Sequence, residues 1–406
     1  MEPMETKGPL SGIKVLDFAH VLSAPYTTML LGDLGAEVLK VEKPGMGDGL
    51  RNSPPLQNGE SSYYFCANRN KKCIAVDLKR PEGVELIKDM MGEFDVVVEN
   101  FRPGVMDRLG LGYEVAKKIR PDVVYASLNA FGDHGPYRDK PGFELIVQSL
   151  TGVVSVTSPE GGPPAKVQIQ MVDLCGGMFL CIAILGALFH RQRTGEGQLV
   201  KTSLYEATVA MMTNLVGIAL MGAKVPTGMR TRNPQLFPSQ AFKTKDGHIS
   251  VVCTPNHWPR FCRALGKEEW IKHPQYSEVG WRVENYDQME KLVEEVTITK
   301  NTAQWQQLLE AAQVACGPMN RVEDMFNDPQ FKDLDLVAEM VHTVAGKIEV
   351  LKPPFSLSKT PAQVYLPPPA LGEHTMQVLG QMGLSREQID RLIAEDIVQP
   401  LNRGNA

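Results

Sequence analysis

Residues 166–189, KVQIQMVDLCGGMFLCIAILGALF, contain one acidic residue, Asp173, and no charged side chain follows it up to Phe189. An aspartate at the start of an apolar helix is commonly an N-cap, whose oxygen accepts hydrogen bonds from the free N–H groups of the first turn. A carboxylate held against a helix N-terminus can also stay ionised when it is partly buried, and could then act as a nucleophile. The residue types alone leave both interpretations open.

Composition narrows the classes of partner. The 406 residues include 42 basic and 47 acidic side chains, for a net charge of −5, so no global positive field favours nucleic acid. The seven cysteines show no CxxC spacing, which indicates neither a disulfide framework nor a metal site and fits a reducing cytoplasm.

Neither the first residues of the chain nor its apolar runs indicate a membrane protein. The start of the chain, MEPMETKGPL, is charged and unlike a signal peptide. The apolar runs 174–189 and 207–223 are shorter than the roughly 20 residues that a membrane span needs. We therefore expect both to be core or interface helices.

Strand and helix patterns alternate in the first third of the chain, which predicts βαβ units and a largely parallel sheet. Strand-like runs lie at 13–19, 37–42, 73–78, 95–101 and 122–128, and helical patterns at 25–35 and 81–94. The turn after the first strand, AHVLSAP, lacks the GxGxxG fingerprint of a nicotinamide-binding domain. The glycine-rich PGMGDG (44–49) follows the second strand instead, and we interpret it as a loop.

The sequence patterns divide the chain into domains. We expect residues 1–200 to form the N-terminal part of a large α/β domain, followed by a linker helix over 201–225. A smaller α+β domain is predicted at 226–325, with a hairpin over 240–253 that turns at Asp246-Gly247. Residues 326–406 contain a proline-rich strap that cannot be central sheet. We expect it to return to the large domain and to end in a helix near 376–394.

The chain resembles the class III CoA-transferases, the CaiB/BaiF family, over nearly its whole length. The matching segments, in the family's order, are PLSGIKVLDFAHVLSAPYTTMLLGDLGAEVLKVEKPGMGD (9–48), NRNKKCIAVDL (68–78), VVVENFRPGVMDRLGLGYE (96–114), VQIQMVDLCGGM (167–178), QAFKTKDGHI (240–249), CGPMNRVEDMF (316–326) and LGEHT (371–375). The resemblance implies a Rossmann-like large domain built from both chain ends, a smaller domain between them, and an interlocked, ring-shaped homodimer.

The resemblance also implies the chemistry. Asp173 matches the family's covalent catalyst, which forms a mixed anhydride and then an aspartyl-CoA thioester, so that neither ATP nor a metal is needed. A helix N-terminus would keep this carboxylate ionised, and Gly176 and Gly177 would let ligand atoms approach. The substrates implied are an acyl-CoA, for which we expect succinyl-CoA, and an organic, dicarboxylic acid of the malate, glutarate or benzylsuccinate type.

Coenzyme A is strongly anionic, and its site needs cations, amide hydrogen bonds and apolar surface. The residues that match the family's CoA contacts are Val21, Lys43, Asn100, Phe101, Met106 and Arg108, with Lys71 and Lys72 as a second basic cluster. For each of them, ordinary surface charge or core packing is the competing interpretation.

The acceptor pocket is predicted more loosely. Its candidates are His20, Leu22, His134, Arg230 and Arg232. Formyl-CoA transferases carry glutamine where Leu22 stands, which argues against formyl chemistry. Arg230 and Arg232 lie where those enzymes have a glycine-rich flap, and could bind a second carboxylate.

Two alternatives stay open at this point. Racemases of the same fold use a histidine in a Gly-His-Asp context, for which this chain has Gly142-Phe143-Glu144, and phenylalanine cannot transfer a proton. The chain could also be a CoA-binding subunit of a hetero-oligomeric transferase.

Overall fold

The computed structural model describes residues 8–401, which fall into two compact units. The first unit takes the described residues of three segments, 1–151, 168–217 and 336–406, and the second takes 152–167 and 218–335. The first unit thus draws on both ends of the chain. The predicted linker helix over 201–225 is instead the end of a strand followed by two helices, α9 (Leu204–Met211) and α10 (Thr213–Leu220). The helix α9 begins there because the hydroxyl of Ser203 caps it.

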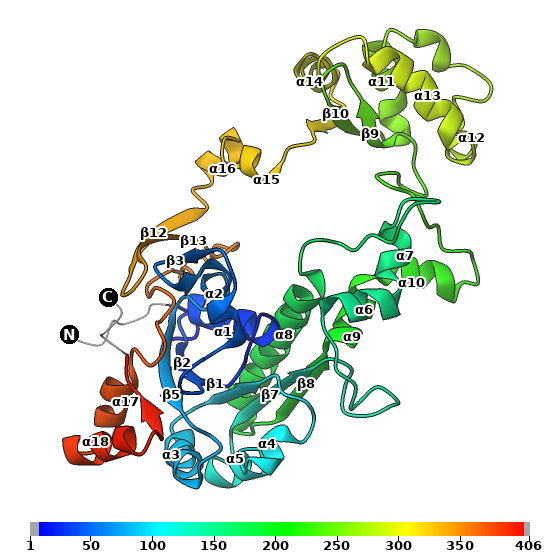
Figure 1. Cartoon of the computed structure of the whole chain (residues 1–406). Coiled ribbons are helices and arrows are strands. Elements are labelled where there is room, and N and C mark those ends of the chain that lie inside the picture. The colour runs from blue at the N-terminus through cyan, green and yellow to red at the C-terminus, as the bar shows by residue number, and fades with distance from the viewer. Residues whose placement is uncertain (1–7, 402–406) are drawn as a thin grey trace. The chain divides into compact units, whose positions relative to one another are not determined.

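A seven-stranded sheet forms the centre of the first unit, in the order β14-β5-β2-β1-β6-β7-β8 (Figure 1). Its strands are β1 (Lys14–Asp17), β2 (Glu37–Glu42), β5 (Lys71–Val76), β6 (Val96–Glu99), β7 (Val124–Asn129), β8 (Leu199–Ser203) and β14 (Val398–Gln399). All pairs are parallel except β14 with β5, which confirms the predicted α/β class. The six parallel strands have the doubly wound order, and this order reverses between β1 and β6.

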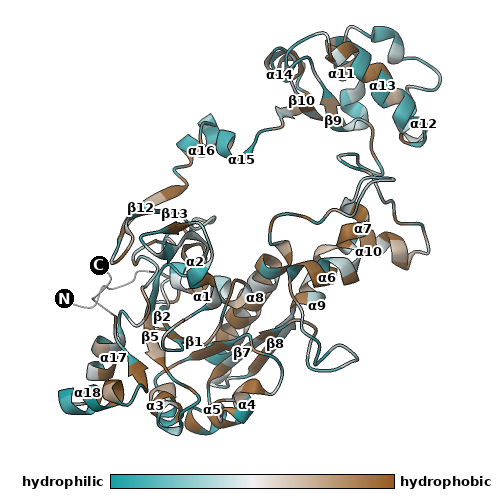
Figure 2. Cartoon of the chain, in the orientation of Figure 1, coloured by the Kyte–Doolittle hydropathy of each residue, from teal (hydrophilic) through white to brown (hydrophobic). Residues whose placement is uncertain are grey.

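Helices cover both faces of this sheet. One face packs against α1 (Ser23–Asp33) and α8 (Met171–Thr194), and the other against α3 (Pro81–Met91), α5 (Tyr113–Ile119), α17 (Thr375–Gln381) and α18 (Arg386–Ala394). Successive strand residues serve opposite faces, so that Val15 packs with α1 and α8 while Leu16 packs with α3 and α17. The central residues of these strands are therefore hydrophobic on both faces of the sheet, and brown, hydrophobic residues are visible in the strands of Figure 2.

The single helix expected near 376–394 is broken into α17 and α18. Gly383 adopts a φ of +88°, which ends the first helix. Ser385 then caps the second helix in a capping box with Gln388. The strap that precedes α17 has no strand after β13, as its proline content predicted.

Smaller elements complete the first unit. They are η1 (Gly49–Asn52), the hairpin β3 (Leu56–Gln57) and β4 (Glu60–Ser61), α2 (Ser62–Phe65), α4 (Val105–Arg108), α6 (Glu144–Thr151) and the hairpin β12 (Val337–His342) and β13 (Gly346–Leu351).

The second unit is an α+β fold around a three-stranded antiparallel sheet, ordered β11-β10-β9. The predicted hairpin is confirmed, because β9 (Ser239–Lys243) pairs with β10 (His248–Val252) around a turn that contains Asp246-Gly247. The third strand is β11 (Ala315–Pro318). The remaining elements are α7 (Val153–Thr157), η2 (Pro255–His257), α11 (Trp258–Ala264), η3 (Glu268–Trp270), α12 (Val279–Glu284), α13 (Tyr286–Thr297), α14 (Thr302–Ala311), α15 (Val322–Met325) and α16 (Pro329–Asp333).

Among residues 8–401, α8 alone is long and apolar enough to cross a membrane, and half of its most apolar window is buried inside the protein. The core helix of a globular domain meets the same criteria, so this finding is weak evidence for a membrane span.

Candidate active site

The carboxyl ends of β1 and β6 adjoin at the point where the strand order reverses. In doubly wound sheets this crevice is where ligands bind. The segment that follows β1 contains His20 and Val21, and the segment that follows β6 contains Asn100 and Phe101. Lys43 follows β2 at the same edge, since β2 runs parallel to β1. The fold therefore brings together five of the residues predicted to contact CoA or the acceptor.

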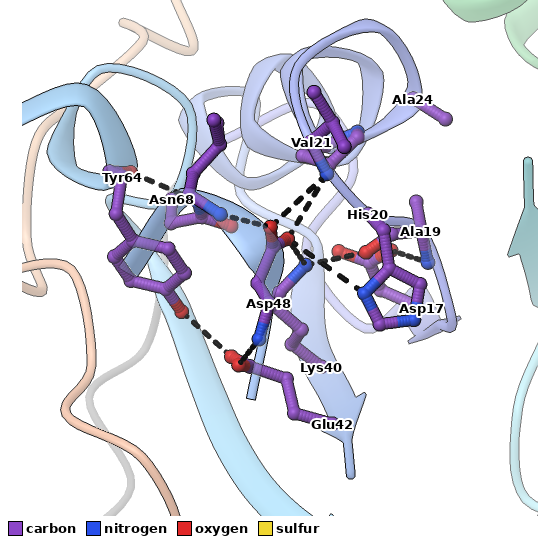
Figure 3. Close-up of polar contacts among 12 residues, drawn as sticks. Asp17, Ala19, His20, Val21, Ala24, Lys40, Glu42, Asp48, Tyr64 and Asn68 are labelled. Atoms are coloured by element: carbon purple, nitrogen blue, oxygen red, sulfur yellow. Dashed lines mark hydrogen bonds and ion pairs between the residues drawn. The ribbon is translucent and has the colours of Figure 1, made fainter. Parts of the chain in front are cut away.

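Side chains hold the backbone of the β1–α1 turn in place. Asn100 bonds both backbone groups of His20, accepting from its N–H at 2.8 Å and donating to its carbonyl at 2.8 Å. The N–H of Ala19 donates to Asp17 at 2.9 Å. Val21 donates its N–H to both carboxylate oxygens of Asp48, at 3.2 and 3.1 Å (Figure 3). These three N–H groups are consequently not available to a phosphate.

The imidazole of His20 lies partly exposed between an aromatic ring and a carboxylate. Its ring packs edge-on against Phe101, with 5.3 Å between centroids, and its Nδ1 lies 3.9 Å from Asp48. Burial, and then the positive charge of Lys40, lower the pKa of His20. Histidine with a lowered pKa is neutral at physiological pH and can accept a hydrogen bond.

The predicted cationic residues separate into two sets. Lys43 and Arg108 are exposed, and Arg108 ends α4, which follows β6. Lys71 and Lys72 instead begin β5, and the start of a parallel strand lies at the opposite edge of the sheet from its carboxyl end. They do not share the crevice with Lys43.

Neither of these two lysines is a free surface cation on the crevice. Lys71 is fully buried, and its ammonium donates to Asp17, to the carbonyl of Pro25 and to Asn68. Lys72 lines a separate cavity of about 480 Å³ at the amino edge. The expectation that the NRNKK cluster binds CoA is therefore wrong for Lys71, and Lys72 belongs to a different part of the surface.

Asp173 lies in the first turn of α8, the helix that connects β7 to β8, and is partly exposed. A crossover helix of this kind begins at the carboxyl edge of the sheet, where the β1–α1 turn also lies. The start of α8 packs on the start of α1, since a Cβ on Gly177 would come within 2.4 Å of the carbonyl oxygen of Ser23. Thr27 also donates to the carbonyl of Gly177 at 2.8 Å. Asp173 and Val21 thus stand at the N-termini of two helices in contact.

The N-cap interpretation of Asp173 is wrong, because another carboxylate caps α8. Glu144 is buried at the start of α6 and accepts from the N–H of Val172 at 3.2 Å and from the N–H of Asp173 at 3.0 Å. Gln148 donates to the same carboxylate at 2.6 Å. The residue at the N-cap position, Gln170, makes no capping hydrogen bond. Within residues 8–401 no hydrogen bond to the Asp173 carboxylate is found.

This arrangement changes the charge state expected for Asp173. Burial, and then the negative charge of Glu144, raise the pKa of Asp173 to about 7. We expected the helix N-terminus to keep the group ionised. The Glu144 carboxylate already accepts the N–H groups of Val172 and Asp173. Burial and the negative charge of Glu144 therefore outweigh the attraction of the helix N-terminus for the Asp173 carboxylate.

Two further expectations are corrected by packing. The carbonyl of Ser23 lies where a Cβ of Gly177 would be, and a Cβ on Gly176 would meet Leu204 at 2.8 Å. Both glycines therefore admit neighbouring protein atoms rather than a ligand. Leu22 and Met106 are buried, so neither side chain lies on the open surface of the crevice.

The remaining predicted residues are scattered. His134 is exposed in the loop between β7 and α6. Arg230 and Arg232 belong to the second unit, where both form ion pairs with Glu290. Phe143, which stands where racemases carry histidine, is exposed and has no acid–base group.

Sequence reasoning missed three residues of this site. Lys40 lies between Leu39 and Val41 in the strand EVLKVE and is fully buried, and its partner is Asp48 at 3.2 Å. Asp48 belongs to the glycine-rich segment 44–49, which we interpreted only as a loop. Glu144 had no signal of its own, because its role depends on a helix that begins 27 positions later in the chain. No group of three or more His, Cys, Asp or Glu side chains able to hold a metal is found in the part of the chain that the structure describes.

Fold and site together define a doubly wound α/β protein with a carboxylate at the N-terminus of a crossover helix. The model of CoA-transferase family III matches residues 10–375. The succinyl-CoA:glutarate CoA-transferase of Mus musculus is 37% identical over 394 residues, which cover 96% of this chain and 90% of the mouse protein. The chain therefore belongs to CoA-transferase family III and is a CoA-transferase.

Two other comparisons bear on the assembly and the fold. The beta subunit of the succinyl-CoA–L-malate CoA-transferase of Chloroflexus aurantiacus is 32% identical over 405 residues, covering 98% of this chain and 100% of that one. The crystal structure of a CaiB/BaiF family protein from Brucella suis superimposes with a TM-score of 0.83 at 31% identity, covering 92% of this chain and 99% of that one.

Proposed function

We propose that this enzyme transfers coenzyme A reversibly from succinyl-CoA to a dicarboxylic acid, with glutarate as the first acceptor to test. The position of Asp173 carries the proposal: a carboxylate without a hydrogen-bond partner in the described chain, at a helix N-terminus beside the crevice. The 37% identity with the mouse succinyl-CoA:glutarate enzyme supports this donor and this acceptor.

The reaction proceeds through covalent intermediates on Asp173. Its carboxylate attacks the thioester carbonyl of succinyl-CoA, which forms a mixed anhydride and expels CoA thiolate. The thiolate attacks the aspartyl carbonyl, which forms an aspartyl-CoA thioester and releases succinate. The acceptor carboxylate attacks this thioester, and the returning thiolate cleaves the new anhydride to give acceptor-CoA and free Asp173.

The environment of Asp173 suits a carboxylate nucleophile. Burial, together with Glu144, raises its pKa to about 7, and nucleophilicity rises with basicity. Above this pH the group is ionised yet poorly hydrated, so less solvation is lost on attack. The capping hydrogen bonds of Glu144 also fix the backbone from which Asp173 projects.

CoA is held at the same edge of the sheet. Lys43 and Arg108 supply exposed cations for phosphates, and Val21, Asn100 and Phe101 form the adjoining surface. Arg230 and Arg232 stay predictions for carboxylate binding. Both belong to the second unit, where their guanidinium groups already bind the carboxylate of Glu290, so a ligand carboxylate would have to replace Glu290.

The test is peptide mapping after incubation with succinyl-CoA and a hydroxylamine quench. We expect a hydroxamate at Asp173 in the wild-type chain and none in Asp173→Asn. Glu144, a second carboxylate close by, is the internal control and should stay unmodified. Hydroxamate elsewhere, or turnover by Asp173→Asn, would refute the covalent route.

We further propose that the chain acts as a homodimer in the cytoplasm. Helix α8 exposes Met178, Ile182 and Phe189, an apolar row at near-helical spacing that another surface could cover. All seven cysteines are free thiols, which fits a reducing compartment. Because one relative is a beta subunit, the purified chain should be tested alone: a dimeric mass by light scattering together with activity supports the proposal, and activity only with a second subunit contradicts it.

A further inference from the structure

Val21 adopts a backbone conformation that its side chain disfavours. Its φ is +66°, in the left-handed region that β-branched residues almost never occupy. Burial of the side chain does not offset this strain, because 42% of the Val21 surface is exposed. Strain of this kind persists only where the surroundings impose it, and it concentrates at functional sites.

The surroundings that impose it are a buried ion pair. The carboxylate of Asp48 is fully buried, accepts the Val21 N–H with both oxygens and lies 3.2 Å from the ammonium of Lys40, which is also fully buried. The same ammonium donates to the carbonyl of Ala19, two residues before Val21. Figure 3 shows Asp48 between Val21 and Lys40. The Lys40–Asp48 pair thus forms hydrogen bonds to the backbone on both sides of His20, at Ala19 and at Val21.

A buried ion pair of this kind contributes little net stability, because desolvation of two charges offsets their attraction. Its effect here is conformational. Asp48 also accepts from the N–H of Leu50 at 3.0 Å, and its own N–H donates to Glu42 at 2.6 Å, so the carboxylate is itself anchored. A strained, exposed residue held by an anchored pair is pre-organised for a ligand.

We propose that Asp48, supported by Lys40, is a positioning residue that holds Val21 in the left-handed conformation and thereby shapes the surface offered to acyl-CoA. This inference rests on the proposed function, since it assigns the crevice beside Val21 to the CoA thioester. Asp48 touches no reacting atom. It acts on substrate binding through the turn.

The test is Asp48→Ala, measured by steady-state kinetics with succinyl-CoA and by calorimetry with CoA. Without the Asp48 carboxylate, Val21 can leave the left-handed conformation. If that conformation falls to about a tenth of the population, the apparent affinity for CoA falls about tenfold. We therefore expect KM for acyl-CoA and Kd for CoA to rise about tenfold while kcat changes by less than about twofold.

Glycine at position 21 supplies the decisive control, because glycine adopts a positive φ without steric cost. In a Val21→Gly background, loss of Asp48 should change Kd by less than about twofold. An equal rise in both backgrounds would mean that Asp48 supports the fold and not this conformation, and would overturn the proposal.

A matched variant controls for lost stability. Asp33 is another buried carboxylate of the first unit, paired with Arg69 at 2.6 Å, and it lies at the end of α1 opposite the turn. Asp33→Ala should lower the melting temperature and leave Kd unchanged. If Asp48→Ala does not fold, Lys40→Met/Asp48→Ala removes both buried charges together and gives the same comparison.

The two proposals fail in different ways. An enzyme that binds CoA normally but transfers none from succinyl-CoA refutes the donor and leaves the calorimetric test of Asp48 valid. A wild-type Kd in the folded Asp48→Ala variant refutes the role of Asp48 in holding Val21, and does not affect the assignment of succinyl-CoA as the donor.

Discussion

Replacement of Asp173 by asparagine should abolish CoA transfer and stabilise the protein at high pH. In the folded chain the pKa of Asp173 is raised to about 7 from its ordinary value of 3.8, first by burial and then by Glu144. The folded state therefore favours the neutral acid, and ionisation costs free energy of folding. This cost is absent below the unfolded pKa, grows as the pH rises toward 7, and is constant above it.

The magnitude follows from the difference between the two pKa values. A difference of about three units at about 1.36 kcal/mol each gives up to about 4 kcal/mol of destabilisation above pH 7. The partial exposure of Asp173 makes this an upper bound. Asparagine has nearly the same size but no charge, so Asp173→Asn does not carry this free-energy cost of ionisation.

The assay compares the melting temperatures of wild type and Asp173→Asn at about pH 5 and about pH 8. We expect the variant to melt at a higher temperature than wild type, by a margin that is larger at the higher pH. Asp139→Asn, at an exposed aspartate, should show no such pH-dependent margin. A margin that is independent of pH, or an Asp173 variant less stable than wild type at about pH 8, would refute the argument that this carboxylate is held in an unfavourable environment.

Two further predictions concern catalysis. Glu144→Gln removes the negative charge beside Asp173, so the rise of kcat/KM with pH should shift to lower pH. The shift should stop short of 3.8, because burial is the larger cause of the raised pKa of Asp173 and remains in the variant. An inflection at the wild-type pH would contradict an effect of Glu144 on the pKa of Asp173. Lys43→Ala should raise KM for succinyl-CoA about tenfold, as expected for a lost charge-assisted hydrogen bond, with kcat nearly unchanged, and a selective loss of kcat would show that Lys43 acts on the transition state instead.

The main elements of the large sheet could be predicted from sequence because their signals are local. The strand β2 occupies the predicted residues 37–42. The helix predicted over 81–94 begins at Pro81, as expected, but ends at Met91. The break between α17 and α18 was missed, although Gly383 and the capping serine Ser385 mark it in the sequence. Local patterns report an element more reliably than its interruption.

The site could be predicted only where one residue carries its chemistry. Asp173 stands out because the residues around it are apolar. Its cap was unpredictable, since Glu144 reaches it from 29 residues away. Lys71 was misplaced for a related reason: in the sequence it belongs to a basic cluster, but the register of β5 turns its side chain toward Asp17 inside the protein.

The absence of a glycine-rich fingerprint after β1 now has a structural reason. In a nucleotide-binding doubly wound fold, the N–H groups of this turn bind the pyrophosphate. Here Asp17, Asn100 and Asp48 already accept the N–H groups of Ala19, His20 and Val21. A phosphate beside this turn would therefore need donors other than these three N–H groups. The turn is free to present an apolar side chain beside the helix that carries Asp173, so the same edge of the same fold can serve acyl transfer in place of hydride transfer.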